Sequence, residues 1–286
     1  MKIGSLCTGY GGLDMAVEAY FNAEMVWCAE NDKYASKVIA ERFNKPNLGD
    51  IKQIDWASLE PIDILTAGYP CQPFSHAGQR KGENDKRHIW PNILKGISIL
   101  RPKIIVLENV RGHLSLGFKE VLGDLAQNGY DAKWRIVRAS DVGAPHQRAR
   151  LFIIAYSNSE GFQGTWNKAN DLTNGFTSNS NCNACEESRR TDREISAESG
   201  GLQSRQNLGK ARSQYRCSCE MAKQEIPPTL DQGRLNTKFV EYIMGLPSGW
   251  VSDLDLSRSQ QLKILGNGVV PQQAYHALEL LHGSWL

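Results

Sequence analysis

The 286-residue chain lacks the signals of a membrane or secreted protein. None of its apolar runs approaches the roughly 18 residues that a membrane-spanning helix needs. The N-terminus, MKIGSLCTGYGGLD, has one basic residue and then a glycine-rich turn, where a signal peptide would continue with an apolar stretch. A large net charge is absent too, since 33 Lys and Arg balance 31 Asp and Glu. This balance permits a nucleic-acid partner but does not argue for one.

The cysteine pattern does not suggest a disulfide framework. Seven cysteines are present: Cys7, Cys28, Cys71, Cys182, Cys185, Cys217 and Cys219. Their number is odd and the first three are far apart in apolar surroundings, which fits a reducing cytosol. The last four could form a zinc site, but Cys217 and Cys219 have one intervening residue where two to four are favoured. Free thiols are the preferred interpretation, and zinc is the alternative.

Apolar runs alternate with amphipathic stretches up to about residue 157, and no internal repeat is present. After the apolar start IGSL, short buried strands are predicted at 24–29, 62–67, 104–108, 133–139 and 151–156. Helical spacing of apolar residues predicts helices at 13–21, 32–43, 91–100 and 118–127, with Asp32 and Pro91 as start signals. Alternating strands and helices predict a parallel sheet that is covered on both faces.

The pattern changes between Ser157 and about Leu235, where Ser, Asn, Gly and Gln are dense and the charges cancel. By composition alone this stretch could be a disordered insert. Such a long loop is uncommon inside a compact domain unless it is functional or mobile. Amphipathic helices are predicted again at 238–245 and 271–282.

The first candidate site is the glycine-rich segment Cys7–Gly12, between an apolar strand and a helix. Glycines at such a turn let a ligand approach the backbone, and the helix N-terminus offers free N–H groups. Glu30 closes the second predicted strand, where an acidic residue can bind the ribose hydroxyls of a nucleotide. Asp50, in GDI, lies near a probable loop. The alternative is a glycine-rich turn that merely packs, but Glu30 in register favours the nucleotide.

The second candidate is Cys71, between Pro70 and Pro73 after the strand IDILT. Each proline restricts its predecessor to extended backbone, which excludes a helix-core position for this cysteine. A thiol at the carboxyl end of a strand could be a nucleophile, particularly where positive charge lowers its pKa. The alternative is a small buried thiol, and the flanking prolines favour the nucleophile.

Two further candidates follow in the chain. Glu108 ends the strand IIVLE and is predicted to face the same site as Cys71, where partial desolvation would raise its pKa and make it an acid. The alternative is a cap made by Asn109, with Glu108 as a solvated neighbour. Arg148 and Arg150 precede LFIIA and, as alternate strand residues, are predicted to share one face that suits a phosphate or a base oxygen. A solvated basic face is the alternative.

Taken in chain order, these residues resemble the DNA (cytosine-5)-methyltransferases. The similarity runs through CTGYGG at 7–12, Glu30, GDI at 49–51, PCQPFS at 70–75, ENV at 108–110, HQRARLF at 146–152 and LGNGVVPQQA at 265–274. Residues 77–87 also resemble the mobile catalytic loop of that family. The resemblance covers about 1–156 and 234–286. It departs from the family pattern at Cys7, where Phe is common, at His146, where Gln is common, and near Arg234, where an arginine-led motif is weak.

The resemblance implies an α/β fold. Its main part would be a Rossmann-like, S-adenosylmethionine-dependent methyltransferase domain made of 1–156 plus 262–286. A smaller, irregular target-recognition domain would span 157–261. The implied activity is methyl transfer to C5 of a cytosine that is flipped out of a specific DNA sequence.

By similarity, each functional residue has an implied role. Cys71 would add to C6 of the cytosine, Glu108 would hold or protonate N3, and Arg150 would bind O2. Arg148 would support the same pocket or a phosphate, and the loop from Phe74 to Arg87 would close over the base. The residues implied to bind S-adenosylmethionine are Gly9, Tyr10, Gly11 and Gly12 at the methionine end, Glu30 at the ribose, Asp50 and Ile51 at the adenine, and Gly68, Pro70, Trp90, Asn267 and Val269 elsewhere along the pocket.

Three rival interpretations remain. The tRNA-directed branch of the same superfamily shares the thiol and cofactor motifs, although a long polar middle region favours a reader of DNA grooves. A catalytically idle binding protein would not need Cys71 and Glu108. An amino-methylating enzyme fits less well, because the only PP follows Ile226 instead of a polar residue. We expect a monomer that acts on double-stranded DNA in a bacterial or phage-related cytoplasm, either alone or with a cognate restriction endonuclease.

Overall fold

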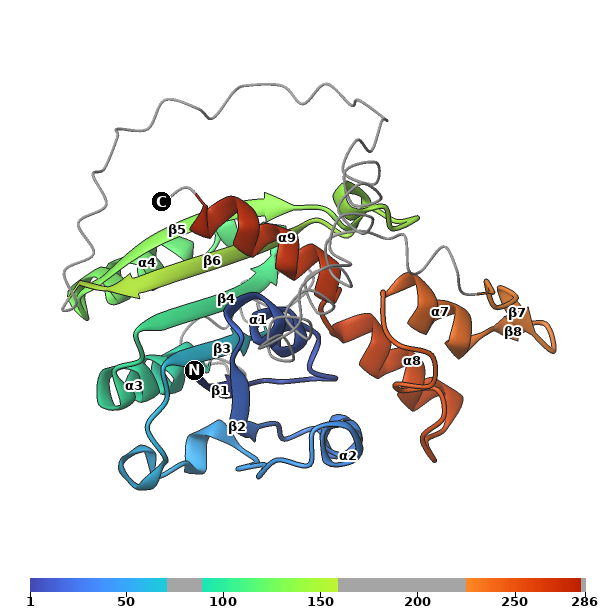
Figure 1. Cartoon of the computed structure of the whole chain (residues 1–286), viewed down its shortest axis with the longest axis horizontal. Helices are drawn as coiled ribbons and strands as arrows, with labels where there is room; N and C mark the ends of the chain where they lie inside the picture. Colours follow the sequence, from blue (N-terminus) through green and yellow to red (C-terminus); the bar gives the residue numbers. More distant parts are fainter. Residues whose placement is uncertain (71–88, 159–224, 284–286) are drawn as a thin grey trace, which may run out of the picture.

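The computed structural model describes residues 1–70, 89–158 and 225–283. Its centre is a six-stranded sheet with the order β2-β1-β3-β4-β6-β5 (Figure 1). The strands are β1 Lys2–Leu6, β2 Glu24–Ala29, β3 Ile64–Gly68, β4 Ile104–Val110, β5 Tyr130–Val137 and β6 Arg150–Ser157. A small hairpin of β7 Leu230–Asp231 and β8 Arg234–Leu235 lies outside this sheet. The predicted α/β class is confirmed.

The prediction of a wholly parallel sheet was wrong at one strand. β1, β2, β3 and β4 pair in parallel, whereas β6 runs antiparallel to both β4 and β5. A parallel connection usually crosses the sheet through a helix. Residues 138–149 link β5 to β6 and contain only one short 3₁₀ turn, Ala139–Val142, so the chain turns straight back instead.

The described helices are α1 Gly12–Phe21, α2 Lys33–Arg42, α3 Trp90–Leu100, α4 Phe118–Gln127, α7 Thr237–Ile243, α8 Arg258–Asn267 and α9 Pro271–His282. Short 3₁₀ turns occur at Ile51–Gln53, Trp56–Ser58 and Arg111–Ser115. The predicted start signals are confirmed: Asp32 accepts hydrogen bonds from the N–H groups of Tyr34 and Ala35, and Pro91 lies in the first turn of α3. Only α8 was not predicted.

Helix α8 was missed because part of its buried face is polar. Gln261 is buried beside Ile264 and Leu265, and its side-chain amide donates to the carbonyls of Ser252 and Leu254, at 3.0 and 3.2 Å. A buried amide with such partners is satisfied. It nevertheless interrupts the apolar spacing by which an amphipathic helix is recognised.

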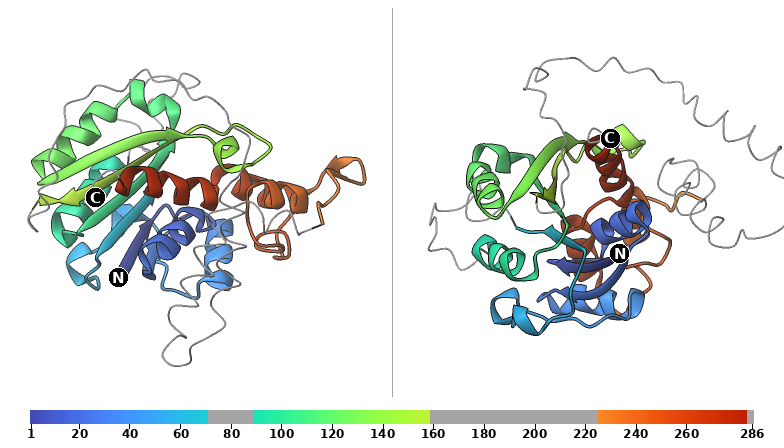
Figure 2. Two further views of the ribbon diagram at one scale, coloured as in Figure 1. Left: turned by 45° about the horizontal axis from the view of Figure 1, so that its top comes forward. Right: turned by 60° about the vertical axis from the view of Figure 1, so that its left-hand side comes forward.

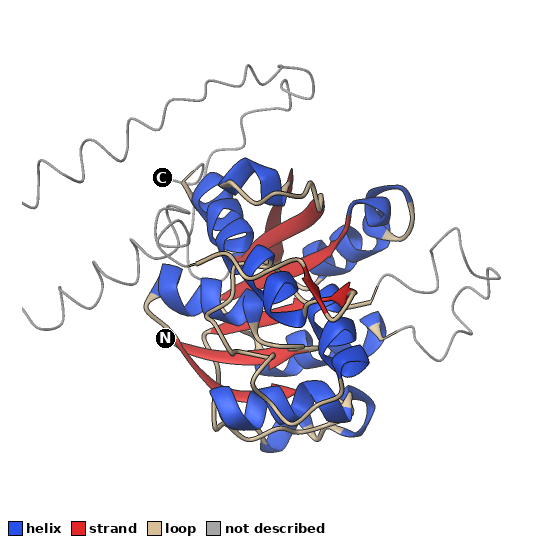
Figure 3. Ribbon diagram, turned by 90° about the vertical axis from the view of Figure 1, so that its right-hand side faces the viewer, coloured by secondary structure: helices blue, strands red, loops and turns tan. Residues whose placement is uncertain are grey.

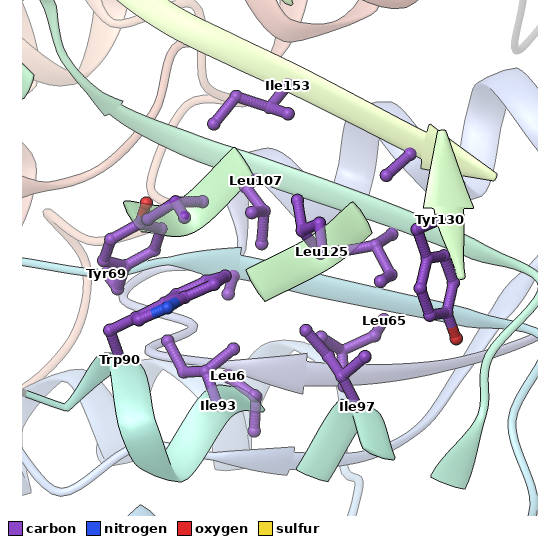
Figure 4. Close-up of a cluster of buried hydrophobic side chains, with 14 of the residues drawn as sticks. Leu6, Leu65, Tyr69, Trp90, Ile93, Ile97, Leu107, Leu125, Tyr130 and Ile153 are labelled. Carbon is purple, nitrogen blue, oxygen red and sulfur yellow. The ribbon is translucent and has the colours of Figure 1, made fainter. Parts of the chain in front are cut away.

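Helices cover both faces of the sheet and enclose one core on each side (Figure 3). Successive strand residues point to opposite faces, so Leu65 packs in one core and Ile64 in the other. The first core lies against α3 and α4 and contains Tyr69 and Trp90 (Figure 4). No helix in the described ranges is both long and apolar enough to cross a membrane.

The C-terminal helices return to the N-terminal part of the chain. Helix α9 lies alongside α1 in the second core (Figure 2). Tyr10 donates its hydroxyl proton to the carbonyl of Val269 at 2.8 Å, and a Cβ at Gly12 would lie 2.0 Å from that same oxygen. Glycine at position 12 therefore permits this close approach. The predicted division into 1–156 plus 262–286 and 157–261 stays a prediction.

Candidate active site

A cavity of about 530 Å³ opens where the parallel strands end. Cys7 and Glu30 follow β1 and β2, Gly68 ends β3, and Glu108 lies near the end of β4, while α8 supplies the opposite wall. Open α/β sheets bind ligands at this carboxyl edge. The lining residues are Cys7, Gly9, Glu30, Asp32, Ala35, Gly68, Tyr69, Pro70, Glu108, Asn109, Val110, Arg150, Lys263, Ile264, Gly266 and Asn267.

One end of the cavity is organised by Glu30. Its Oε2 accepts a hydrogen bond from the Gly9 N–H at 2.9 Å, and its Oε1 accepts one from the Asp32 N–H at 2.8 Å. Both oxygens keep further acceptor capacity, because a carboxylate has about four lone-pair sites. The carboxylate is thus held in one orientation and can still receive hydroxyl groups.

A charged pair joins α2 to α8 across the same end. Lys263 Nζ lies 2.8 Å from Asp32 Oδ2, while Asp32 Oδ1 caps α2. Both side chains line the cavity. Because the pair is largely exposed, we assign it little stabilising energy.

The other end of the cavity holds an ion pair whose acidic member is buried. Arg150 Nε lies 3.1 Å from Glu108 Oε1, and Glu108 is only 7% exposed. Burial raises the pKa of Glu108 from 4.5 to about 7, against the opposing effect of Arg150 and Arg148. Glu108 is therefore not the solvated neighbour of a cap, as the alternative interpretation had it. It is poised to carry a proton near neutral pH.

Arg148 lies outside the strand on which it was predicted to alternate with Arg150. Strand β6 begins at Arg150, and Arg148 precedes it with a φ of 33°, so strand alternation does not apply to it. Its Nη2 donates to the carbonyls of Gly266 and Gly268, at 2.9 and 2.5 Å. Arg148 thereby fixes the turn between α8 and α9, which contributes Gly266 and Asn267 to the cavity.

Residues 1–188 match the family model for C-5 cytosine-specific DNA methylases. The chain belongs to this family. Among curated relatives, Type II methyltransferase M.Bsp6I of Bacillus sp. (strain RFL6) is 35% identical over 171 residues, covering 57% of this chain and 54% of the relative. Type II methyltransferase M.NgoBI of Neisseria gonorrhoeae is 36% identical over 163 residues, covering 55% and 51%. The match thus spans about half the length of these methylases.

Solved structures share the fold of this methylase family member over nearly the whole chain. Entamoeba histolytica methyltransferase EhMeth aligns with a TM-score of 0.65 and 19% identity, covering 100% of this chain and 99% of its own. S. pombe Dnmt2 methyltransferase aligns with a TM-score of 0.62 and 17% identity, covering 98% and 99%. At such identities the likeness concerns the fold, and the Rossmann-like class predicted for this methylase is confirmed.

Several residues predicted to bind a cofactor lie behind the cavity wall of the methylase. Tyr10 is fully buried against Gly268, and Val269 is 7% exposed. Gly11 has a φ of 84°, and the Phe43 ring lies where its Cβ would be. Packing thus accounts for Tyr10, Gly11 and Gly12, whereas Gly9 lines the cavity.

Asp50, Ile51 and Trp90 are also absent from the lining. Asp50 caps the turn Ile51–Gln53 by accepting the Lys52 N–H at 3.0 Å, and Ile51 is buried in the first core. The Trp90 ring lies against Tyr69, with 5.5 Å between ring centroids. The predicted residues that line the cavity are Gly9, Glu30, Gly68, Pro70, Glu108, Arg150 and Asn267.

The sequence-based prediction overlooked other residues of the cavity. No role was predicted for Tyr69, although it belongs to the motif around Cys71. Lys263 lies on helix α8, which was not predicted. Cys7 lines the cavity, but burial, Glu30 and Asp50 raise the pKa of its thiol to about 12, so it stays protonated. Tyr69 could have been noticed because it follows a predicted strand, whereas no helix was predicted around Lys263.

Some predicted positions lie outside the described residues. They include Cys71, which follows Pro70 in the chain, the loop residues up to Arg87, and the possible zinc ligands Cys182, Cys185, Cys217 and Cys219. Within the described ranges, no group of three or more His, Cys, Asp or Glu side chains could hold a metal.

Proposed function

We propose that this methylase family member transfers a methyl group from S-adenosylmethionine to C5 of a cytosine in DNA. The observation that carries this proposal is the pair of buried Glu108 and partly exposed Arg150 at the strand end beside Gly68 and Pro70. Cys71 is the next residue in the chain after Pro70. Glu108 would thus supply an acid and Arg150 a hydrogen-bond donor to the cytosine oxygen, and the candidate thiol of Cys71 is adjacent in sequence to Pro70, which lines the same cavity.

The chemistry needs these groups because C5 of cytosine is a poor nucleophile. The Cys71 thiolate would form a bond to C6. The electron pair of the C5–C6 double bond would then form a C4–C5 double bond, and the pair of the C4–N3 double bond would move onto N3. Glu108, as a carboxylic acid, would place its proton on N3 and prevent negative charge from building there. Arg150 would bind O2. The result is an enamine with a nucleophilic C5.

The other end of the cavity suits the cofactor. S-adenosylmethionine would supply an electrophilic methyl group on its sulfonium sulfur. A volume of about 530 Å³ falls in the usual range for small-molecule sites. Glu30, held by the backbone of Gly9 and Asp32, would accept the ribose hydroxyls, and Asn267 would contribute from the turn after α8.

The chain's own residues would also complete the cycle. Formation of the C5–methyl bond would break the bond from that methyl group to the sulfonium sulfur, which keeps the electron pair as a thioether. A base would then remove the C5 proton, and the electron pair of the C5–H bond would re-form the C5–C6 double bond. The sulfur of Cys71 would leave C6 with the electron pair of the C–S bond, and the N3 proton would return to Glu108. Both C5 and C6 are buried in a duplex, so the cytosine would enter the cavity flipped out, at a cost of a few kcal/mol of unstacking. Arg150 and Glu108 would hold the flipped base.

Double-stranded DNA is the proposed partner, in a bacterial cytoplasm, since the curated relatives named above come from bacteria. A monomer would be sufficient to act on a single flipped base. The Type II names of the relatives support a restriction endonuclease as a cognate partner. Each of these points deepens the same proposal.

Bisulfite sequencing tests the proposal directly. Genomic DNA would be compared from cells that lack C5 methylation and express the wild-type chain, Cys71→Ala or Glu108→Gln. We expect methylated cytosines in one short motif with the wild type and none with Cys71→Ala. If the wild-type chain leaves DNA unmethylated, the DNA function is refuted, and bisulfite sequencing of tRNA then tests the RNA-directed alternative.

A further inference from the structure

We propose that Tyr69 and His113 form a positioning pair, which holds the backbone before Cys71 in register with Glu108. This inference rests on the proposed function. The two residues lie on different loops: Tyr69 follows β3, and His113 lies in the 3₁₀ turn after β4. Neither was singled out from the sequence.

A buried hydrogen bond joins the two side chains. The Tyr69 hydroxyl lies 2.9 Å from His113 Nε2, and the residues are 5% and 2% exposed. Their rings meet edge to face, with 5.6 Å between centroids. The bond thus connects the ends of two neighbouring strands beneath the cavity floor, which Tyr69 itself lines.

The backbone of Tyr69 is tied to the same strand end. Asn109 Nδ2 donates to the Tyr69 carbonyl at 3.1 Å, and the Asn109 Oδ1 accepts the Val110 N–H at 2.8 Å. Asn109 adjoins Glu108 in β4. Tyr69 is therefore held by its carbonyl and its hydroxyl at two points of the segment that carries Glu108. Pro70 follows with a restricted φ, so these two contacts fix the backbone of Tyr69 and Pro70 relative to Glu108.

Packing alone does not require the polar groups. The Trp90 ring packs against the Tyr69 ring (Figure 4). The Trp90 indole N–H donates to Asp124 at 2.7 Å, and the Phe118 ring centroid lies 6.0 Å from that of His113. A phenylalanine at position 69 would fill the same space. In the described part of the chain, His113 Nδ1 has no hydrogen-bond partner, which makes burial of this imidazole costly. This cost is explained if the hydrogen bond between the His113 imidazole and the Tyr69 hydroxyl fixes an orientation of Tyr69 that packing alone would not fix.

The test uses Tyr69→Phe, His113→Phe and the double variant, with Tyr156→Phe as a matched control. Tyr156, in β6, also forms a hydrogen bond with a histidine, since its hydroxyl lies 2.7 Å from Nδ1 of His282 at the end of α9, but neither residue lines the cavity. We expect kcat for methyl transfer to fall about 10- to 100-fold in all three pair variants, because small misplacements of reacting groups have effects of that size. The KM for S-adenosylmethionine should stay within about twofold, and Tyr156→Phe should retain its kcat.

Thermal unfolding of the same proteins separates positioning from stability. Tyr69→Phe removes the hydroxyl that pairs with the buried His113 Nε2 and should lower Tm, whereas the double variant replaces both partners by apolar rings and should regain much of that loss. A double variant that regains kcat together with Tm would overturn the proposal, as would full kcat in Tyr69→Phe. A wild-type chain with no methyltransferase activity would instead overturn the proposed function, since the variants would then have no activity to lose.

Discussion

Replacing Glu108 by Gln should change how stability depends on pH, by an amount that follows from its burial. Burial raises the pKa of Glu108 in the folded chain from 4.5 to about 7. Between these values the folded state holds the proton more tightly than the unfolded state does. Stability from this group is thus fully present below pH 4.5 and is lost as pH rises through about 7. Gln has nearly the same shape as Glu but cannot ionise. The Glu108→Gln variant should therefore not lose this stability as pH rises.

The magnitude follows from the same shift. One pKa unit corresponds to about 1.4 kcal/mol, so the free energy of unfolding of Glu108→Gln, relative to wild type, should rise by about 3 kcal/mol between pH 4.5 and 8. Urea unfolding of both proteins across this range gives the difference at each pH. Glu108→Gln should at the same time lose about 10²- to 10⁴-fold in kcat, the usual contribution of a general acid.

Asp14 provides a matched control for the stability measurement. It is buried in the first turn of α1, accepts a hydrogen bond from Thr66, and burial raises its pKa from 3.8 to about 7. Asp14→Asn should show the same sign of pH dependence while retaining kcat, because Asp14 does not line the cavity. A difference between wild type and Glu108→Gln that does not vary with pH would refute the reasoning about Glu108.

Three further predictions concern the pH profile, the α8–α9 turn and the contact of α1 with it. The kcat/KM of the wild type should fall above about pH 7, where Glu108 loses its proton, and a rise there would exclude an acid role. Arg148→Met removes both carbonyl contacts, so the KM for S-adenosylmethionine should rise roughly tenfold with less change in kcat; the reverse pattern would favour contact with the base. Gly12→Ala should destabilise by about 1–3 kcal/mol in urea, whereas Gly123→Ala, with open space around its Cβ, should be neutral or stabilising; equal effects would contradict the close approach to Val269.

Local patterns predicted most of the fold because most elements are marked by their own residues. The predicted strand at 24–29 coincides with β2, and Asp32 caps the helix that it was expected to start. The reversal of β6 and the existence of α8 depend on other facts. One is the lack of a crossover helix between β5 and β6, and the other is the set of distant carbonyls that satisfy Gln261. Neither is visible in the periodicity of a single segment.

The residues of the candidate site also fall into two groups, those marked by local sequence and those placed by contacts with distant residues. Glu30 and Glu108 could be predicted because each closes a buried strand, and parallel strands bring their carboxyl ends to one edge. Arg148 could not, because its partners are two carbonyls more than a hundred residues away, and a left-handed φ of 33° turns it out of the strand pattern. Tyr69 and His113 meet only because β3 and β4 are neighbours in the sheet. Groups that would touch substrate are thus marked in the sequence by strand ends, whereas the groups that hold them in place are identified only by their contacts in the fold.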